Sequence, residues 1–228
     1  MNLSTVRKYT KKHSVVAGLL LKNPVVVLGL DLPFVIATST SLRNAAAMSI
    51  MLLCIHMFTL LAARFTAGRM HRWLRMLCHI FVSTIMMVLT RALVVRMFHQ
   101  DILNSLGMYI YLMGVNGMTI YQALAVKRKT PLLQVLAAAF QNVLGFVLVM
   151  FLLSFVRELL GNGTLWGVVI PLPAVFPGLL IPFSGFISVG FLLAFGRFLN
   201  KRVTAFLITE SARTDLRYAQ LRGENRDD

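Results

Sequence analysis

Residues 23–40 read NPVVVLGLDLPFVIATST, and the interpretation of the whole chain starts from this stretch. It is apolar enough to lie in a membrane, but Asn23-Pro24 opens it, Gly29 lies in its middle, and Asp31 and Pro33 follow. A proline inside a helix removes a backbone donor and clashes with the preceding turn, so a continuous helix is not expected. Unpaired backbone at membrane depth is tolerated only where protein or a water-filled cavity surrounds it. We therefore predict a broken or re-entrant helix that is buried among its neighbours.

The composition is that of a membrane protein. The chain has 228 residues, 57% of them hydrophobic, and a mean hydropathy of +0.75. A helix that crosses a bilayer needs about 20 mostly apolar residues. Five stretches meet this length plainly and the broken stretch adds a sixth, which predicts an all-α polytopic membrane protein. The expected spans are residues 14–40, 43–63, 73–95, 104–126, 131–156 and 178–199.

The distribution of charge predicts the domain organisation. A basic arm (1–13) precedes a single membrane domain (14–200), and a charged tail (201–228) follows it. Lys and Arg gather in the arm, in the loops 64–72 and 127–130, and in the tail, whereas the alternate loops hold few. Because cytoplasmic loops carry the excess of basic residues, we expect both termini in the cytoplasm.

The net charge of +15 does not indicate a nucleic-acid partner. Of the eight acidic residues, only Asp31, Asp101 and Glu158 precede residue 200. The basic residues lie in short loops between apolar runs, as the positive-inside rule requires of a protein with several spans. We therefore expect membrane lipid around the chain and no nucleic acid.

The two halves of the membrane domain, residues 14–97 and 104–200, resemble each other weakly. Each opens with an interrupted span, and three spans per half place the halves in opposite orientations. Paired broken helices in inverted halves indicate a site near the middle of the membrane. The alternative is that the glycines only permit close helix packing. The residues that interrupt the two spans and form the candidate ion path or midplane site are Asp31 and Pro33, with Gly29, in the first half, and Gly114, Asn116 and Gly117 in the second.

Asp31 is the most unusual polar residue of the chain. An ionisable side chain inside a span is costly and usually faces the bundle interior or a water-filled path. Asp31 could pair with an arginine such as Arg91, bind a cation or relay a proton. Alternatively, Pro33 ends a half-span and Asp31 lies near the membrane surface. Asn116 would place an amide in the middle of the membrane, where it suits a cation, a close-packed cofactor or simple helix packing.

Two cysteines and two histidines lie within apolar runs, namely Cys54, Cys78, His56 and His79. These are metal-ligating residue types. Adjacent helical residues such as Cys78 and His79 point in different directions, however, so they do not readily share one ion, and a buried cysteine is usually a small hydrophobe. We predict no metal site here. The sequence also lacks a phosphate-binding loop, a dinucleotide fingerprint and a catalytic triad, so no catalytic residue is predicted.

Several segments resemble one family of membrane subunits. LSFVRELLGNGTLWG at 153–167 is the most specific, and 23–40, VNGMTIYQALAVKRK at 115–129 and PFSGFISVGFLLA at 182–194 add weaker similarity. Together they resemble the RnfE/NqrD subunits of Rnf-type ferredoxin:NAD oxidoreductases and of the Na-translocating NADH:quinone oxidoreductase, over most of residues 15–202. The residues that carry the family motif are Arg157, Glu158, Gly161, Asn162, Gly163 and Thr164.

The resemblance also implies a cofactor for which this chain lacks the ligands. In the family, one cysteine in each broken helix helps to hold a 2Fe-2S cluster shared with an RnfA/NqrE sister subunit. The matching positions here are Leu32 or Asp31, depending on the alignment, and Gly117. Such clusters are held by thiolates, so we predict no cofactor in this chain. A cluster rebuilt from Cys54 and Cys78, which lie in other spans, is the alternative.

The resemblance implies an integral subunit of an Rnf/Nqr-like, ion-translocating electron-transfer complex in a bacterial cytoplasmic membrane. We expect it to pair with an RnfA/NqrE-like sister subunit and with other redox subunits, in a scaffolding or ion-path role. The alternative function is a stand-alone transporter of an ion or small molecule with the same inverted-repeat fold.

Overall fold

The structure is a computed structural model that describes residues 29–171, 175–192, 194–195, 198 and 202. The predicted basic arm, the start of the first span and nearly all of the charged tail lie outside these residues. The described chain is mostly helical, and three of its helices are long and apolar enough to cross a membrane. These are α5 (Leu42–Thr66), α6 (Arg72–Phe98) and α10 (Leu132–Asn162). The prediction of a helical membrane protein is thus confirmed, and the three helices contain the expected spans 43–63 and 73–95 and all of 131–156 except Pro131.

The ends of the long helices follow from local sequence. Ser41 precedes α5, and its hydroxyl accepts a hydrogen bond from the backbone N–H of Asn44 at 3.2 Å, which caps the helix. Gly163 ends α10 in the left-handed conformation (φ 64°), which glycine adopts without a Cβ clash. The 31 residues of α10 make a helix about 46 Å long at 1.5 Å per residue. Since the hydrocarbon core is about 30 Å thick, α10 extends beyond it.

Shorter elements connect the long helices. The expected span 104–126 is divided into several pieces, and the apolar helix Pro182–Leu192 lies within the expected span 178–199. Two short strands pair antiparallel as a hairpin directly after α10. The short elements are α4 (Leu32–Thr38), α7 (Asp101–Leu106), α8 (Tyr109–Leu112), η1 (Met113–Val115), α9 (Gly117–Ala125), β1 (Thr164–Leu165), β2 (Val168–Val169) and η2 (Pro177–Leu180).

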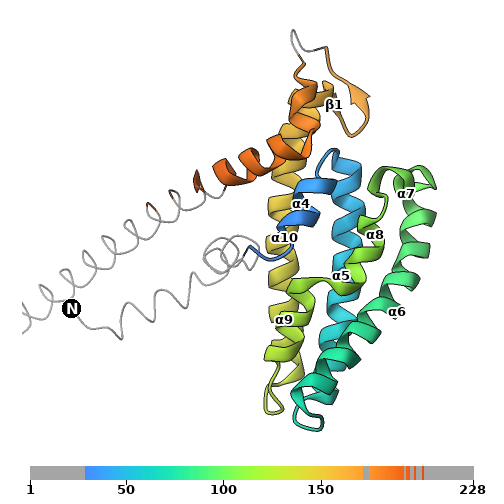
Figure 1. Ribbon diagram of the computed structural model, residues 1–228, viewed down its shortest axis with the longest axis vertical. Helices are drawn as coiled ribbons and strands as arrows, with labels where there is room; N and C mark the ends of the chain where they lie inside the picture. The colour runs from blue at the N-terminus through green and yellow to red at the C-terminus, as the bar shows by residue number, and fades with distance from the viewer. Residues whose placement is uncertain (1–28, 172–174, 193, 196–197, 199–201, 203–228) are drawn as a thin grey trace, which may run out of the picture.

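Helix α5 is the centre of the bundle (Figure 1). It packs against α10 on one side and α6 on the other, and α9 also packs against it. Within their most apolar windows, 56% of α5 is buried but only 28% of α6. Helix α6 therefore has an apolar face that the described part of the chain leaves uncovered.

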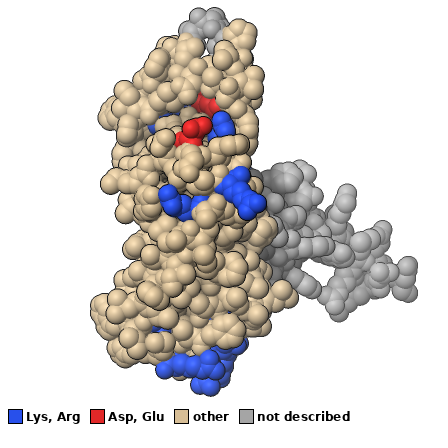
Figure 2. Space-filling model, turned by 90° about the vertical axis from the view of Figure 1, so that its right-hand side faces the viewer, with Lys and Arg blue, Asp and Glu red and all other residues tan. Residues whose placement is uncertain are grey.

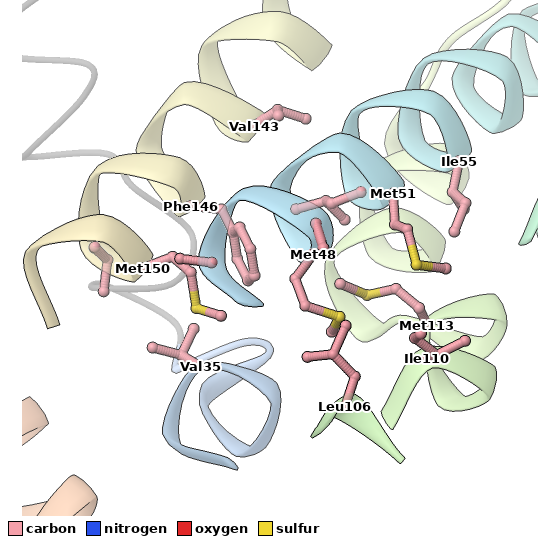
Figure 3. Packing of buried hydrophobic residues seen from close by; sticks show 14 of the residues in the cluster. Val35, Met48, Met51, Ile55, Leu106, Ile110, Met113, Val143, Phe146 and Met150 are labelled. Carbon is pink, nitrogen blue, oxygen red and sulfur yellow. The ribbon is translucent and has the colours of Figure 1, made fainter. Parts of the chain in front are cut away.

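The main core joins α4, α5, α10 and the broken segment before α9 (Figure 3). Met48 and Met51 of α5 lie between Phe146 of α10 and Met113 of η1, and Val35 of α4 lies beside Met150. All of these side chains are fully buried. Unbranched methionines fill irregular gaps well, which suits a core where short helical pieces meet a long helix.

The two central basic loops lie at the same end of the bundle. A Cβ added to Gly68 would lie 3.0 Å from Cδ of Arg128. Arg64, Arg69 and Arg128 line one open pocket between the loops. Figure 2 shows Lys and Arg at this end of the bundle, and others at mid-height and beside the acidic side chains toward the opposite end.

Candidate functional site

The first break in the chain lies directly before α4. Gly29 (φ 66°) and Asp31 (φ 64°) both adopt the left-handed region, and α4 begins at the next residue, with Pro33 in its first turn. Proline fits the first turn of a helix because the N–H there has no intrahelical partner. The backbone therefore turns at Gly29–Asp31 and the proline fits inside α4, whereas the part of the predicted broken helix before Gly29 lies outside the described residues.

The second break lies between η1 and α9. Asn116 is extended and fully buried, and its side-chain Oδ1 accepts a hydrogen bond from the Thr119 N–H at 2.9 Å, which caps α9. Its amide nitrogen donates to Sδ of Met113 at 3.3 Å. A Cβ on Gly114 would lie 3.2 Å from the backbone of Thr84, so this glycine allows η1 to approach α6 closely.

The two breaks meet in space. Asp31 Oδ1 accepts a hydrogen bond from the backbone N–H of Met118 at 3.4 Å, and Asn116 and Gly117 lie beside this carboxylate. A Cβ on Gly117 would lie 3.6 Å from the same oxygen. A carboxylate at a helix N-terminus is stabilised by the free N–H groups and by the helix dipole. Asp31 therefore takes the place of a cap on α9, although 87 residues separate it from Met118.

An arginine partner, one of the possibilities that the sequence left open for Asp31, is not observed in the described residues. The Arg91 guanidinium lies 5.6 Å from the ring centroid of Tyr111. The pairing with Arg91 that the sequence suggested is therefore wrong. Asp31 is only 6% exposed, and its Oδ2 has no hydrogen-bond partner within the part of the chain that the structure describes. The carboxylate thus keeps one buried oxygen open to a further ligand.

Sequence reasoning undervalued His56. Its ring is fully buried on α5, with Nδ1 3.0 Å from Thr119 Oγ1 and Nε2 2.9 Å from Gln122 Oε1, both on α9. The signal was the spacing of Thr119 and Gln122, which lie three residues apart and so share one face of a helix. Neither residue was selected from the sequence.

The family-motif residue Arg157 holds three segments together. It is fully buried on α10 and bonds only to neutral oxygens in the described chain. On one side Nη1 donates to Ile36 O and Ser39 Oγ, both at 2.6 Å. On the other side the guanidinium donates to the carbonyls of Leu179 at 2.9 Å and Leu180 at 2.8 Å. The fork of donors on arginine suits this arrangement, because one planar group can bond several acceptors at once.

Glu158, the next residue, points its carboxylate at backbone donors. Oε2 accepts from the Leu42 N–H at 2.5 Å, at the start of α5, and Oε1 accepts from the Gly167 N–H at 3.0 Å. Oε1 also accepts from the Thr164 hydroxyl at 3.3 Å. The buried carboxylate is thus stabilised by the N-terminus of α5.

The remaining family-motif residues shape the turn after α10. Gly161 packs against Leu180, which a Cβ would meet at 2.9 Å. Asn162 is exposed as the last residue of α10, and Gly163 closes the helix. The motif Arg157, Glu158, Gly161, Asn162, Gly163 and Thr164 therefore binds segments that lie far apart in sequence, at a distance from the Asp31–Asn116 contact.

The residues at the family's cluster positions do not fit an iron–sulfur cluster. Asp31 offers a carboxylate that already bonds to α9, Leu32 an alkyl group and Gly117 no side chain. Thiolates are the ligands that such clusters require. Cys54 and Cys78 lie on α5 and α6, and no group of three His, Cys, Asp or Glu side chains in the described residues could hold a metal ion. The donor set at the two breaks therefore supports no cluster.

Comparison with known proteins shows a consistent group of relatives. A family model described as "Rnf-Nqr subunit, membrane protein" matches residues 12–193. One subunit of the proton-translocating ferredoxin:NAD(+) oxidoreductase complex of Clostridium ljungdahlii is 26% identical over 189 residues, which are 82% of this chain and 88% of that protein. One subunit of the Na(+)-translocating NADH-quinone reductase of Pseudoalteromonas translucida is 27% identical over 180 residues, 75% of this chain and 84% of that protein. Its counterpart in Shewanella halifaxensis is 25% identical over the same shares, 75% of this chain and 84% of that protein.

Proposed function

Because the chain belongs to the Rnf-Nqr family of membrane subunits, we propose that it is an integral subunit of an ion-translocating electron-transfer complex. The observation that carries this proposal is the match over residues 12–193 to subunits of such complexes. The complex resides in a bacterial cytoplasmic membrane, where this chain pairs with an RnfA/NqrE-like sister subunit.

The proposal includes six spans arranged as two inverted repeats. Its support is that the two halves have the same order of elements. The break before α4 is followed by the long apolar helix α5, and the break before α9 is followed by the long apolar helix α10. The two basic loops at one end of the bundle support a cytoplasmic location for that end and for both termini.

Within the complex, the chain acts as a scaffold and as part of an ion path. The unpartnered oxygen of Asp31, beside Asn116 and Gly117, supports the ion path. At the family's cluster positions this chain has Asp31 or Leu32 and Gly117, none of which supplies a thiolate. These residues support a subunit that binds no cluster. Electrons then pass through other subunits of the complex.

A stand-alone transporter of an ion or small molecule is the second candidate. The observation that favours it is that neither break carries a thiol. The ligands that would hold the family's electron-carrying cluster are therefore absent from both breaks. Such a protein would keep the fold and the ion path and need no redox partner.

Purification with its neighbours tests the proposal. The tagged chain is isolated from its own membranes in mild detergent, and co-purifying proteins are identified by mass spectrometry. Recovery with flavin- and iron–sulfur-binding subunits is expected. Recovery alone or as a homo-oligomer, from membranes in which those subunits are present, would overturn the proposal in favour of the transporter.

A further inference from the structure

The hydrogen bonds of His56 extend the Asp31 site along α9. Asp31 Oδ1 accepts a hydrogen bond from the Met118 N–H in the first turn of α9. Asn116 caps α9 through the Thr119 N–H, and the Thr119 hydroxyl bonds to Nδ1 of His56. Nε2 of His56 then bonds to Gln122. Asp31 is 6% exposed, and Asn116, Thr119 and His56 are fully buried, whereas Gln122 is partly exposed. A chain of polar groups thus runs from a buried carboxylate toward the surface.

The direction of this polar chain is set by α9. The helix begins at the Asp31 contact and runs to Ala125, directly before the basic loop 127–130, at the end of the bundle where the basic loops gather (Figure 1). Burying polar side chains in an apolar bundle is costly unless each is bonded. All these groups are bonded except Asp31 Oδ2, which is the open end of the chain.

We propose that Asp31, Thr119, His56 and Gln122 form a proton path from the midplane carboxylate to the basic end of the bundle. This inference rests on the proposed function, and it specifies which ion the complex moves and which residues of this chain the ion passes. Asp31 Oδ2 takes up the proton, and a water molecule beside Asn116 passes it to the Thr119 hydroxyl. His56 then accepts a proton at Nδ1 and releases one from Nε2 to water beside the partly exposed Gln122, whose Oε1 orients the ring. Each carrier gains one proton and loses one, and the path is reset when the Thr119 hydroxyl and the His56 ring reorient and return His56 to the tautomer protonated at Nε2.

The ligand types favour a proton over Na⁺. Imidazole and hydroxyl groups can each accept and donate a proton, whereas a hard metal cation is held by several oxygens. Three other charged or titratable side chains on the packed elements are engaged elsewhere. Arg75 bonds to the carbonyls of Ala123 and Val126, His79 bonds to Thr66, and Arg157 bonds to the far end of α4.

The test uses the intact complex in proteoliposomes, with electron transfer started by its own donor. Proton movement is followed with a pH-sensitive dye and Na⁺ movement with ²²Na⁺, both per electron transferred. For His56→Gln we expect at least a tenfold lower proton yield per electron while electron transfer continues. His79→Gln is the matched control, because His79 is equally buried but bonds to Thr66 on α5; its proton yield should stay within twofold of the wild type.

A second pair of variants separates the path from packing. Thr119→Val keeps the shape but removes the hydroxyl, whereas Thr119→Ser keeps the hydroxyl, so only Thr119→Val should lower the proton yield. An unchanged proton yield in both His56→Gln and Thr119→Val would overturn the path. Transport of Na⁺ without protons by the wild-type complex would also overturn it, while leaving the proposed function intact. Absence of redox subunits from the purified protein would instead refute the proposed function and the path together.

Discussion

Arg157 Nη1 donates a hydrogen bond to Ser39 Oγ at 2.6 Å, although 118 residues separate the two in the chain. Asp31 directly precedes α4 and Ser39 directly follows it. The contact therefore fixes the end of α4 that lies away from Asp31. The same guanidinium bonds to carbonyls of Leu179 and Leu180 before the helix Pro182–Leu192. One side chain of α10 therefore joins the end of α4 to the segment that precedes the helix Pro182–Leu192.

Replacing Arg157 with lysine should destabilise the protein strongly. Lysine keeps the charge but cannot present the planar fork, so several buried carbonyls would lose their donor. Hydrogen bonds to charged groups contribute about 1.5–3 kcal/mol each, and we expect a loss of about 3 kcal/mol, read as a lower unfolding temperature in detergent. Arg43→Lys, at an exposed position in the first turn of α5, is the control and should change little. An unfolding temperature equal to that of the wild type would show that the contacts of Arg157 are replaceable.

Glu158→Gln should loosen the start of α5 and the hairpin after α10. The change removes the negative charge that the Leu42 and Gly167 N–H groups face and replaces one acceptor oxygen with an NH₂ donor. A loss of about 1.4 kcal/mol corresponds to tenfold faster local opening, so amide hydrogen exchange at these two residues should accelerate about tenfold. Exchange in the middle of α6 should not change. Uniform acceleration across the protein would indicate global destabilisation instead of a local loss of capping.

The sequence predicted the long helices and the interruption around Asn116, because apolar length and helix-breaking residues are local properties. It did not predict the contacts that join them. The pairing of Asp31 with Met118 and the packing of His56 on Thr119 depend on how α9 folds back beside α5, which no local pattern encodes. The motif Arg157-Glu158 was recognised by resemblance, but its role as a link between α4, α5 and the hairpin emerged only from the three-dimensional structure.

Gly185→Ala should be destabilising where Gly190→Ala is not. Both glycines lie in the helix Pro182–Leu192, but a Cβ on Gly185 would lie 2.8 Å from Cγ2 of Ile36, while a Cβ on Gly190 would meet nothing within 4 Å. Overpacking a well-filled site typically costs about 1–3 kcal/mol, whereas alanine in place of an unhindered helical glycine gains up to about 1 kcal/mol. Thermal unfolding in one detergent compares the two variants. The same unfolding temperature for both would show that this helix does not pack on α4 as described.

The two cysteines should be dispensable for any iron in the complex. Cys54 and Cys78 are free, lie on α5 and α6, and belong to neither break. In the complex recovered with its redox subunits, Cys54→Ser and Cys78→Ser should therefore leave the iron content per complex and the electron paramagnetic resonance spectrum of the reduced form unchanged. Each serine keeps nearly the same volume, so assembly is expected to be retained. Loss of one iron–sulfur signal from an otherwise intact complex of either variant would mean that the chain has rebuilt its cluster from these residues, and that electrons pass through it after all.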